Sequence, residues 1–171
     1  MRTVFWAALA AFLLDQVSKY LVIHVMQLWR VRQVDVLPPL LNFRYGENRG
    51  INFGLLGGGS EAARWALVVL ALVICAAVLN WVRRTPMSAL ARAGAGLLVG
   101  GALANVLDRL IYGYVLDFLN MSCCGVNNPF VFNLADVFIF AGALALVLLA
   151  QESKGGPPKP RGTGRSKQKG Q

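Results

Sequence analysis

The stretch FNLADVFIFAGALAL, residues 132–146, opens an apolar segment that carries the amide of Asn133 and the carboxylate of Asp136. A membrane-spanning helix needs about 20 mostly apolar residues, and the segment 130–150 has that length and composition. Placing an ionised carboxylate at membrane depth costs about 3 kcal/mol or more. A chain that keeps Asp136 in such a segment is therefore expected to use it.

The rest of the chain has the same apolar character. Its 171 residues are 56% hydrophobic and 15% charged, and its mean hydropathy is +0.54, whereas soluble domains have about 25% charged residues. Further apolar segments cover residues 4–23, 65–82 and 90–112. We predict a membrane all-α protein built as a bundle of four transmembrane helices. A cleavable signal peptide is the alternative for the first segment, although its apolar pattern runs past Asp15 to Val25.

Much of the positive charge lies in the last stretch of the chain. The net charge is +9, and the stretch 153–171 contains Lys154, Lys159, Arg161, Arg165, Lys167 and Lys169. This stretch is rich in Gly and Pro and has no apolar anchor, so we predict a disordered basic tail after a membrane domain at 1–152. We expect it to act in topology or lipid contact, because no aromatic residue is interleaved for stacking on nucleic acid.

The distribution of Lys and Arg predicts the orientation of the bundle, since cytoplasmic loops carry the excess of these residues. In a four-span chain the N-terminus, the second connection and the tail share one side. Arg83, Arg84 and Arg92 lie in or beside the second connection, whereas the third connection, 113–129, has no Lys or Arg. We therefore expect both termini in the cytoplasm and the first and third connections outside.

The first connection has the pattern of strands. In LLNFRYGENRGINFGLL, residues 40–56, apolar and polar residues alternate at 41–45 and again at 51–55, on either side of a turn expected at 46–50. This period of two is typical of paired strands. We predict a small amphipathic β-sheet on the outer side of the membrane. Its apolar face could rest on lipid or on the helix bundle, and the alternation alone leaves both open.

Polar residues interrupt the first and third spans at helical spacings. Asp15 and Lys19 are four positions apart and share a helix face, where we expect a structural ion pair or a lysine that extends to the membrane surface. Asn105, Asp108 and Arg109 repeat this spacing in the third span. Charge compensation between Asp108 and Arg109 is one explanation, and a role beside a functional site is the other.

Asp117 and Asp136 are expected at one membrane depth near the outer interface, because the third span runs outward and the fourth runs inward. If the third span stays helical past Gly113, residues 105, 109, 113 and 117 form a polar stripe that leads to Asp117. Two carboxylates close together at low dielectric share a proton, so one can act as general base and the other as general acid. Peptide hydrolysis, ion or proton transport and a structural bundle all stay open at this point.

Four motifs occur in a fixed order: DQVSK at 15–19, NRGINFG at 48–54, GGALANVLDRLIYGYVLDF at 100–118 and FNLAD at 132–136. As an ordered set they resemble the lipoprotein signal peptidases, the type II signal peptidases of bacteria, over residues 10–150. The resemblance implies an aspartic endopeptidase of the bacterial inner membrane that cuts prolipoproteins before a diacylglyceryl-modified cysteine. It implies no metal or organic cofactor. Membrane lipid and lipidated prolipoproteins are the expected partners of a monomer, and nucleic acid is not expected.

The resemblance also implies which residues form the site. The catalytic aspartates of the family correspond to Asp117 and Asp136. The residues that would bind substrate or support these aspartates are Asn48, Gly50, Asn105, Asp108, Arg109 and Asn133. Asp15 and Lys19 would give structural support.

Two stretches depart from the family pattern. The family loop often reads N-x-G-A-A-F, and here Ile51 and Asn52 replace the two alanines. The stretch NMSCCGVNNP, residues 120–129, matches no motif of the family. This connection is expected to be a mobile loop in which Cys123 and Cys124 are bystanders, because their spacing fits neither a metal site nor a disulfide framework. A lid over the two aspartates is the alternative.

Overall fold

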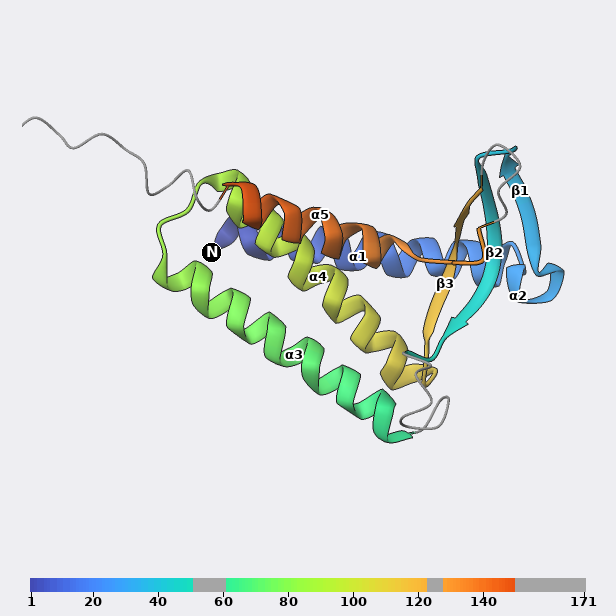
Figure 1. Cartoon of the computed structure of the whole chain (residues 1–171), viewed down its shortest axis with the longest axis horizontal. Helices are drawn as coiled ribbons and strands as arrows, with labels where there is room; N and C mark the ends of the chain where they lie inside the picture. The colour runs from blue at the N-terminus through green and yellow to red at the C-terminus, as the bar shows by residue number, and fades with distance from the viewer. Residues whose placement is uncertain (51–60, 123–127, 150–171) are drawn as a thin grey trace, which may run out of the picture.

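The computed structural model describes residues 1–50, 61–122 and 128–149. The strand expected at 51–55, the thiols of Cys123 and Cys124, and the tail expected at 153–171 lie outside the described residues. In the described part, the helices form an elongated bundle and a small sheet stands across one end of it (Figure 1). The N-terminus lies at the end of the bundle away from the sheet.

The bundle contains helices of unequal length. The long helices are α1 (Arg2–Lys19), α3 (Glu61–Arg84), α4 (Ala89–Ile111) and α5 (Leu134–Leu149), and α1 leads into a π-helical turn, η1 (Tyr20–Val25), and the short helix α2 (Leu28–Val31). Within the described residues, Arg2–Val25, α3 and α4 are long and apolar enough to cross a membrane. This confirms three of the predicted spans. With 16 residues, α5 is shorter than the predicted segment because it begins after Asn133.

Helix α4 is the centre of the bundle. Of the residues in its most apolar stretch 67% are buried, against 17% for α3, and α4 contacts α1, α3 and α5. Glycines allow these contacts: a Cβ atom on Gly96 would lie 2.5 Å from the carbonyl oxygen of Val4 in α1, and one on Gly101 would lie 2.5 Å from that of Ala135 in α5. Small residues let membrane helices approach closely. Helix α4 thereby fixes α1 and α5 relative to each other.

The sheet has three antiparallel strands, β1 (Gln33–Leu37), β2 (Leu41–Asn48) and β3 (Val115–Met121), in the order β1-β2-β3. The alternation at 41–45 correctly predicted a strand. The turn predicted at 46–50 is wrong in part, because β2 continues through Gly46 to Asn48. Among the described residues, the strands beside β2 are β1 and β3, and neither was predicted from the sequence.

The apolar face of the sheet packs on the end of the bundle. Phe43 of β2 and Phe118 of β3 meet edge to face, with ring centroids 5.6 Å apart. They belong to a core cluster with Ile23 of η1, Leu28 of α2 and Leu116 of β3. The sequence left open whether the apolar face of the sheet rests on lipid or on the helix bundle. In the structure, this face contacts the bundle.

Helix α4, the third predicted span, ends before the polar stripe predicted at residues 105–117 is complete. The backbone N–H of Tyr112 donates to the carbonyl oxygen of Asp108 at 2.7 Å, and Gly113 follows with a φ of 83°. This left-handed conformation favours glycine and is a common way for a helix to end. The prediction of a helical stripe that reaches Asp117 is wrong, because the chain turns at Gly113 and Asp117 lies on β3.

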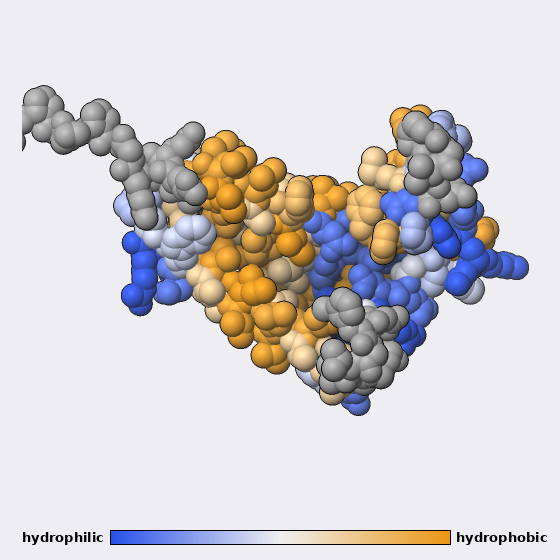
Figure 2. Space-filling model, in the orientation of Figure 1, coloured by the Kyte–Doolittle hydropathy of each residue, from blue (hydrophilic) through white to orange (hydrophobic). Residues whose placement is uncertain are grey.

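The surface reflects this division into a bundle and a sheet. On the face drawn in Figure 2, hydrophobic residues cover most of the helical part, and hydrophilic residues gather toward the sheet and at the opposite tip. Large exposed side chains such as Phe5, Val69, Phe140 and Val147 contribute to the apolar surface. An apolar belt between two polar ends is expected of a protein that spans a bilayer.

Candidate active site

The start of α5 is held against the edge of the sheet by a short backbone ladder. The N–H of Phe132 donates to the carbonyl oxygen of Leu119 at 2.9 Å, and the N–H of Leu119 donates to that of Phe132 at 2.8 Å. These bonds form an isolated antiparallel bridge beside β3. The next residue, Asn133, is thus brought next to Asp117, which lies two positions before Leu119.

Asn133 and Asp136 cap α5 reciprocally. The side-chain oxygen of Asn133 accepts a hydrogen bond from the N–H of Asp136 at 3.0 Å, and the carboxylate of Asp136 accepts one from the N–H of Asn133 at 3.3 Å. This is the geometry of a capping box, in which the two residues satisfy each other's free N–H groups. It answers the question that the sequence raised about a carboxylate in an apolar span, because Asp136 occupies the first turn, where the helix dipole favours negative charge.

Two asparagine side chains join Asp136 to Asp117. The amide nitrogen of Asn133 donates to the carboxylate of Asp117 at 2.6 Å and also faces the side-chain oxygen of Asn105 at 3.2 Å. The amide nitrogen of Asn105 donates to the carboxylate of Asp136 at 3.0 Å. The pair of Asp117 and Asp136, called the dyad below, is thus fixed by amides that come from α4 and the start of α5.

Asp117 is held in a protonated state up to neutral pH. Its side chain is buried, with 2% of the residue exposed. Burial, and secondly the negative charge of Asp136, raise the pKa of Asp117 to about 7, against hydrogen bonds from Asn133 and Asn48 that act to lower it. A buried carboxyl beside a second carboxyl is the arrangement that lets one proton be shared between general acid and general base.

Behind the dyad lies an ion triad made of Asp15, Lys19 and Asp108. The ammonium of Lys19 lies 2.7 Å from a carboxylate oxygen of Asp15 and 2.7 Å from one of Asp108. All three residues are buried. The predicted pair of Asp15 and Lys19 is therefore present, and Lys19 does not extend to the membrane surface.

The carboxylates of the ion triad also hold the backbone next to each dyad residue. Asp15 accepts a hydrogen bond from the N–H of Ala135 at 2.8 Å, and Asp108 accepts one from the N–H of Leu116 at 3.1 Å. Ala135 precedes Asp136, and Leu116 precedes Asp117. Lys19 thus links the two acids that hold the backbone beside Asp117 in β3 and beside Asp136 in α5. The triad is therefore positioned to set the distance between the two dyad residues.

Asp108 forms its salt bridge with Lys19 rather than with Arg109, whose charge interacts with Asp108 without a salt bridge among the described residues. Neighbouring positions on a helix point in different directions. Arg109 instead donates to the carbonyl oxygen of Asn105 at 3.2 Å, and its guanidinium lies close enough to Asp136 to interact with its charge. Arg109 is therefore on the dyad side of α4.

Asn48 and Gly50 lie at the end of β2. The side chain of Asn48 hydrogen-bonds to Asp117 and also accepts from the N–H of Gly50 at 3.1 Å. Gly50 has a φ of 94°, and a Cβ atom there would lie 2.5 Å from the side chain of Leu67. Asn48 therefore contacts the dyad directly, whereas Gly50 shapes the turn that presents it.

A cleft of about 250 Å³ leads along the bundle to this site. It lies between α3, α4 and α5, and its apolar walls include Leu70 of α3, Ala102 of α4 and Ile139 of α5. Asn105 and Arg109 also line it, and Asn105 contacts the dyad. The arrangement can hold an apolar chain beside a pair of carboxyls of which one is buried and has a raised pKa. Within the described part of the chain, no group of three or more His, Cys, Asp or Glu side chains could hold a metal ion.

Two residues of the site were missed by the sequence reasoning. Gln16 donates to Asp108 at 2.9 Å and to Asp15 at 3.3 Å, and its place inside an apolar span beside Asp15 was a usable signal. Gly46 pairs with Asp117 across the sheet. No signal in the sequence identified Gly46, because it could equally belong to a turn.

The sequence of the chain is similar to known peptidases. The family model described as Signal peptidase (SPase) II matches residues 7–151. Lipoprotein signal peptidases of Alteromonas mediterranea and Aeromonas hydrophila are 39% and 38% identical to it, over 84% of this chain in both cases and over 77% and 84% of those proteins. The lipoprotein signal peptidase of Neisseria meningitidis serogroup C is 38% identical over 86% of this chain and 88% of that protein.

The fold is similar to solved structures as well. Two structures of bacterial membrane enzymes, obtained by the in meso method, superpose with TM-scores of 0.75 and 0.73. They are 23% and 26% identical in sequence, and the matches cover 94% and 86% of this chain and 94% and 91% of those chains. Since the family model spans nearly the whole chain and the relatives are 38–39% identical over most of it, the chain belongs to the lipoprotein signal peptidase family, signal peptidase II.

Proposed function

We propose that this chain is a membrane aspartic endopeptidase that removes signal peptides from prolipoproteins by cutting before a diacylglyceryl-modified cysteine. The observation that carries the proposal is the dyad, two carboxyls from β3 and α5 joined by the amides of Asn133 and Asn105. Membership of a peptidase family supports hydrolysis over the transporter alternative.

The dyad activates water for attack on the peptide bond. It holds one proton at neutral pH, because burial and the charge of Asp136 raise the pKa of Asp117 to about 7. The ionised carboxyl takes a proton from a water molecule, while the protonated one donates to the scissile carbonyl oxygen. The water oxygen bonds to the carbonyl carbon, the C–N bond then breaks, and a proton passes to the leaving amine. The products are the signal peptide, with a new carboxylate, and the lipoprotein, with a free amino group on its cysteine.

The surrounding polar residues orient the dyad and the substrate. Asn133 and Asn105 hold the carboxyls through the hydrogen bonds described above. Arg109 lies on the same side of α4, and its positive charge interacts with the carboxylate of Asp136 and helps to hold it in place. Asn48, at the end of β2, reaches Asp117 from the sheet and is exposed, so it is also available to the substrate backbone.

The cleft between α3, α4 and α5 receives the acyl chains of the substrate, and the signal peptide lies between the dyad and the sheet. The apolar walls of the cleft suit hydrocarbon, and Asn105 at its lining contacts the dyad. A lipidated cysteine entering sideways from the bilayer would bring its acyl chains into the cleft and its peptide bond to the carboxyls. This arrangement explains why the enzyme would require lipidation of its substrate.

We further propose that α5 is the fourth span, that both termini are cytoplasmic, and that the dyad lies near the periplasmic face of the inner membrane. The 16 described residues of α5 cover about 24 Å at 1.5 Å per residue, slightly less than the roughly 30 Å of hydrocarbon in a bilayer. Arg83 and Arg84 at the end of α3 support a cytoplasmic location for the end opposite the sheet. We propose that the protein acts as a monomer without a metal or organic cofactor.

Cleavage of a diacylglyceryl prolipoprotein in liposomes tests the proposal. Asp117→Asn and Asp136→Asn should each reduce cleavage by about 1,000-fold or more, because each removes one of the two proton-transferring groups. Asp35→Asn, in β1, is the matched control and should leave the rate within twofold. The unlipidated precursor should not be cut by the wild type.

Retained cleavage in either dyad variant, with the melting temperature of the wild type, would show that the dyad is not the catalytic centre. Equal cleavage of lipidated and unlipidated precursors would instead contradict the proposed role of the apolar cleft.

A further inference from the structure

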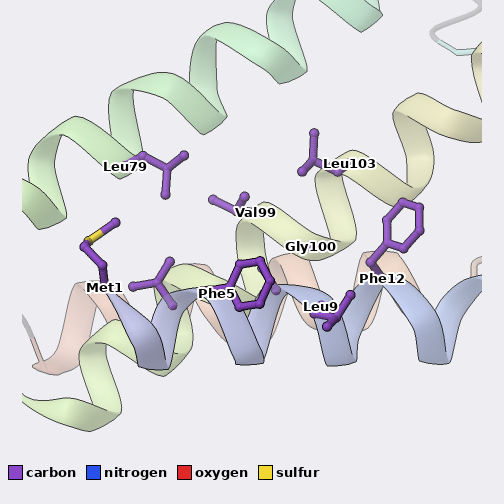
Figure 3. A pocket seen from close by; sticks show the side chains of 10 residues that line it. Met1, Phe5, Leu9, Phe12, Leu79, Val99, Gly100 and Leu103 are labelled. Carbon is purple, nitrogen blue, oxygen red and sulfur yellow. The ribbon is translucent and has the colours of Figure 1, made fainter.

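A second groove, separate from the cleft beside the dyad, lies between α1, α3 and α4 (Figure 3). Its volume is about 460 Å³, within the range of ligand pockets. Leu79 reaches from α3 toward Val99 of α4, and side chains of α1 such as Phe5 and Leu9 line the groove below them. Met1 also lines it, so it extends to the end of the bundle away from the sheet. The lining side chains are all apolar, which excludes a polar ligand within the groove itself.

Two arginines lie next to lining residues at this end of the groove, called its mouth below. Met1 carries the α-amino group, and Arg2 follows it with an exposed side chain. Arg83 lies four positions after Leu79 and therefore one turn further along the same side of α3. It is also exposed. In the described part of the chain, neither Arg2 nor Arg83 belongs to an ion pair.

The acidic side chains of the described residues lie far from this mouth. The described Asp and Glu residues are Asp15, Asp35, Glu47, Glu61, Asp108, Asp117 and Asp136. Each belongs to the sheet or to the part of its helix nearer the sheet, since Glu61 begins α3 and Asp136 begins α5 there. An apolar groove with unpaired cations at one end is complementary to a molecule that joins a hydrocarbon chain to an anion.

We propose that this groove binds one acyl chain of an anionic phospholipid, whose phosphodiester is held by Arg2 and Arg83. Basic pockets between transmembrane helices are typical sites for anionic lipid headgroups. The mouth lies at the end of the bundle where α1 begins and α3 ends, so the lipid belongs to the leaflet on that side. The site is distinct from the dyad cleft, which lies between α3, α4 and α5.

The bound lipid would fasten α3 to the rest of the bundle. Only 17% of the most apolar stretch of α3 is buried, so this helix has the weakest packing of the spans Arg2–Val25, α3 and α4. An acyl chain between Leu79 of α3 and Leu9 of α1 adds apolar contact where the helices leave a groove. We expect the anionic lipid to stabilise the folded protein more than a zwitterionic lipid with the same acyl chains.

Native mass spectrometry of the delipidated full chain tests the proposal. The probes are dioleoyl phosphatidylglycerol and dioleoyl phosphatidylcholine at equal concentration, and the wild type should retain at least fivefold more of the former. The variant Leu79→Trp fills the groove, and the double variant Arg2→Gln with Arg83→Gln removes the charges. Each of these two variants should reduce bound phosphatidylglycerol at least fivefold. The control double variant Arg30→Gln with Arg44→Gln removes two positive charges at the sheet end and should change the amount of bound phosphatidylglycerol less than twofold. If Leu79→Trp does not fold, Leu9→Trp on the facing helix replaces it.

Several results would overturn the proposal. Equal retention of the two lipids by the wild type would exclude recognition of an anionic headgroup. Loss of lipid binding in only one of the two test variants would show that the acyl chain and the headgroup of one lipid are not both held at this site. Unchanged lipid binding in Leu79→Trp, with a raised KM for prolipoprotein or a lost dimer mass, would assign the groove to the substrate or to a second copy of the chain.

Discussion

The ion triad and the dyad each contain two acids in one region of the fold, and they differ in the groups that bond these acids. In the ion triad, the ammonium of Lys19 lies 2.7 Å from both carboxylates, so the charges are neutralised by an ion pair. In the dyad, within the described residues, the carboxyls accept hydrogen bonds from amides of the side chains and the backbone. Amides fix the position of a carboxyl without supplying the full positive charge that would strip its proton. The nature of the partner therefore separates acids that hold the fold from acids that can transfer protons.

The largest effect is expected from removing the cation of the triad. Lys19→Met leaves Asp15 and Asp108 buried without a counter-charge, which should lower the free energy of unfolding by about 3–5 kcal/mol. The measurement is reversible unfolding in detergent. Arg49→Met is the matched control, because its pair with Glu47 is largely exposed and exposed ion pairs contribute little to stability. Similar losses in the two variants would contradict the structural role of the triad.

The next effect concerns the amide between the dyad residues. Asn133→Ala removes the donor to Asp117 and the cap of α5, so we expect kcat to fall about 100-fold and stability to fall by only about 1 kcal/mol. Cleavage kinetics and unfolding are measured on the same preparation. Asn80→Ala, which removes a contact with Arg84 in α3, should change neither. A large loss of stability with an unchanged kcat would place Asn133 with the structural residues.

A smaller, graded effect is expected from pH. Burial and the charge of Asp136 raise the pKa of Asp117 from 3.8 to about 7, so raising the pH through 7 removes the proton that the dyad shares. The rate of cleavage should then fall by up to tenfold per pH unit above about 7. A rate that is constant up to pH 9 would contradict a dyad that works with one proton.

The same shift in pKa makes a prediction for stability. Between about pH 4 and pH 7 the folded protein binds this proton more tightly than the unfolded chain does. The contribution of Asp117 to stability therefore falls as the pH rises through this window. The Asp117→Asn variant lacks the group and should show a weaker dependence of its unfolding free energy on pH in the same range.

The smallest effect tests how much space the dyad needs. A Cβ atom on Gly46 would lie 3.4 Å from Val131 and 3.6 Å from the Cβ atom of Asp117, which are ordinary van der Waals distances. Gly46→Ala should therefore change kcat less than twofold, whereas Gly46→Val adds branches toward Asp117 and should lower it several-fold. Equal activity of the two variants would show that the sheet leaves free space above the dyad.

The sequence predicted most of the helices, because hydropathy and length decide membrane insertion one segment at a time. It predicted the sheet poorly. Strand β3 is buried along almost its whole length, so it lacks the alternation that identified β2. Its sequence also continues the apolar pattern of α4, and a helix as far as Asp117 was a reasonable interpretation until the backbone of Gly113 was known.

The sequence could predict which residues form the site, but not which of them contact each other. The resemblance to a family named Asp117, Asp136 and their neighbours, and the structure places most of these residues around one centre. The partner of Asp108 could not be found from the sequence, because Arg109 is adjacent in the chain whereas Lys19 arrives through the packing of α1 on α4. Ion pairs between residues of different helices depend on that packing, and no short stretch of sequence predicts it.

The contribution of both α1 and α5 to the site has a consequence for biogenesis. Asp15 lies on the first helix and Asp136 on the last described one, and the N–H of Ala135 bonds to Asp15 across this separation. A growing chain that has not yet inserted α5 carries Asp117 but lacks Asp136 and Asn133. On the proposed function, we therefore expect no peptidase activity until α5 has packed against the rest of the bundle.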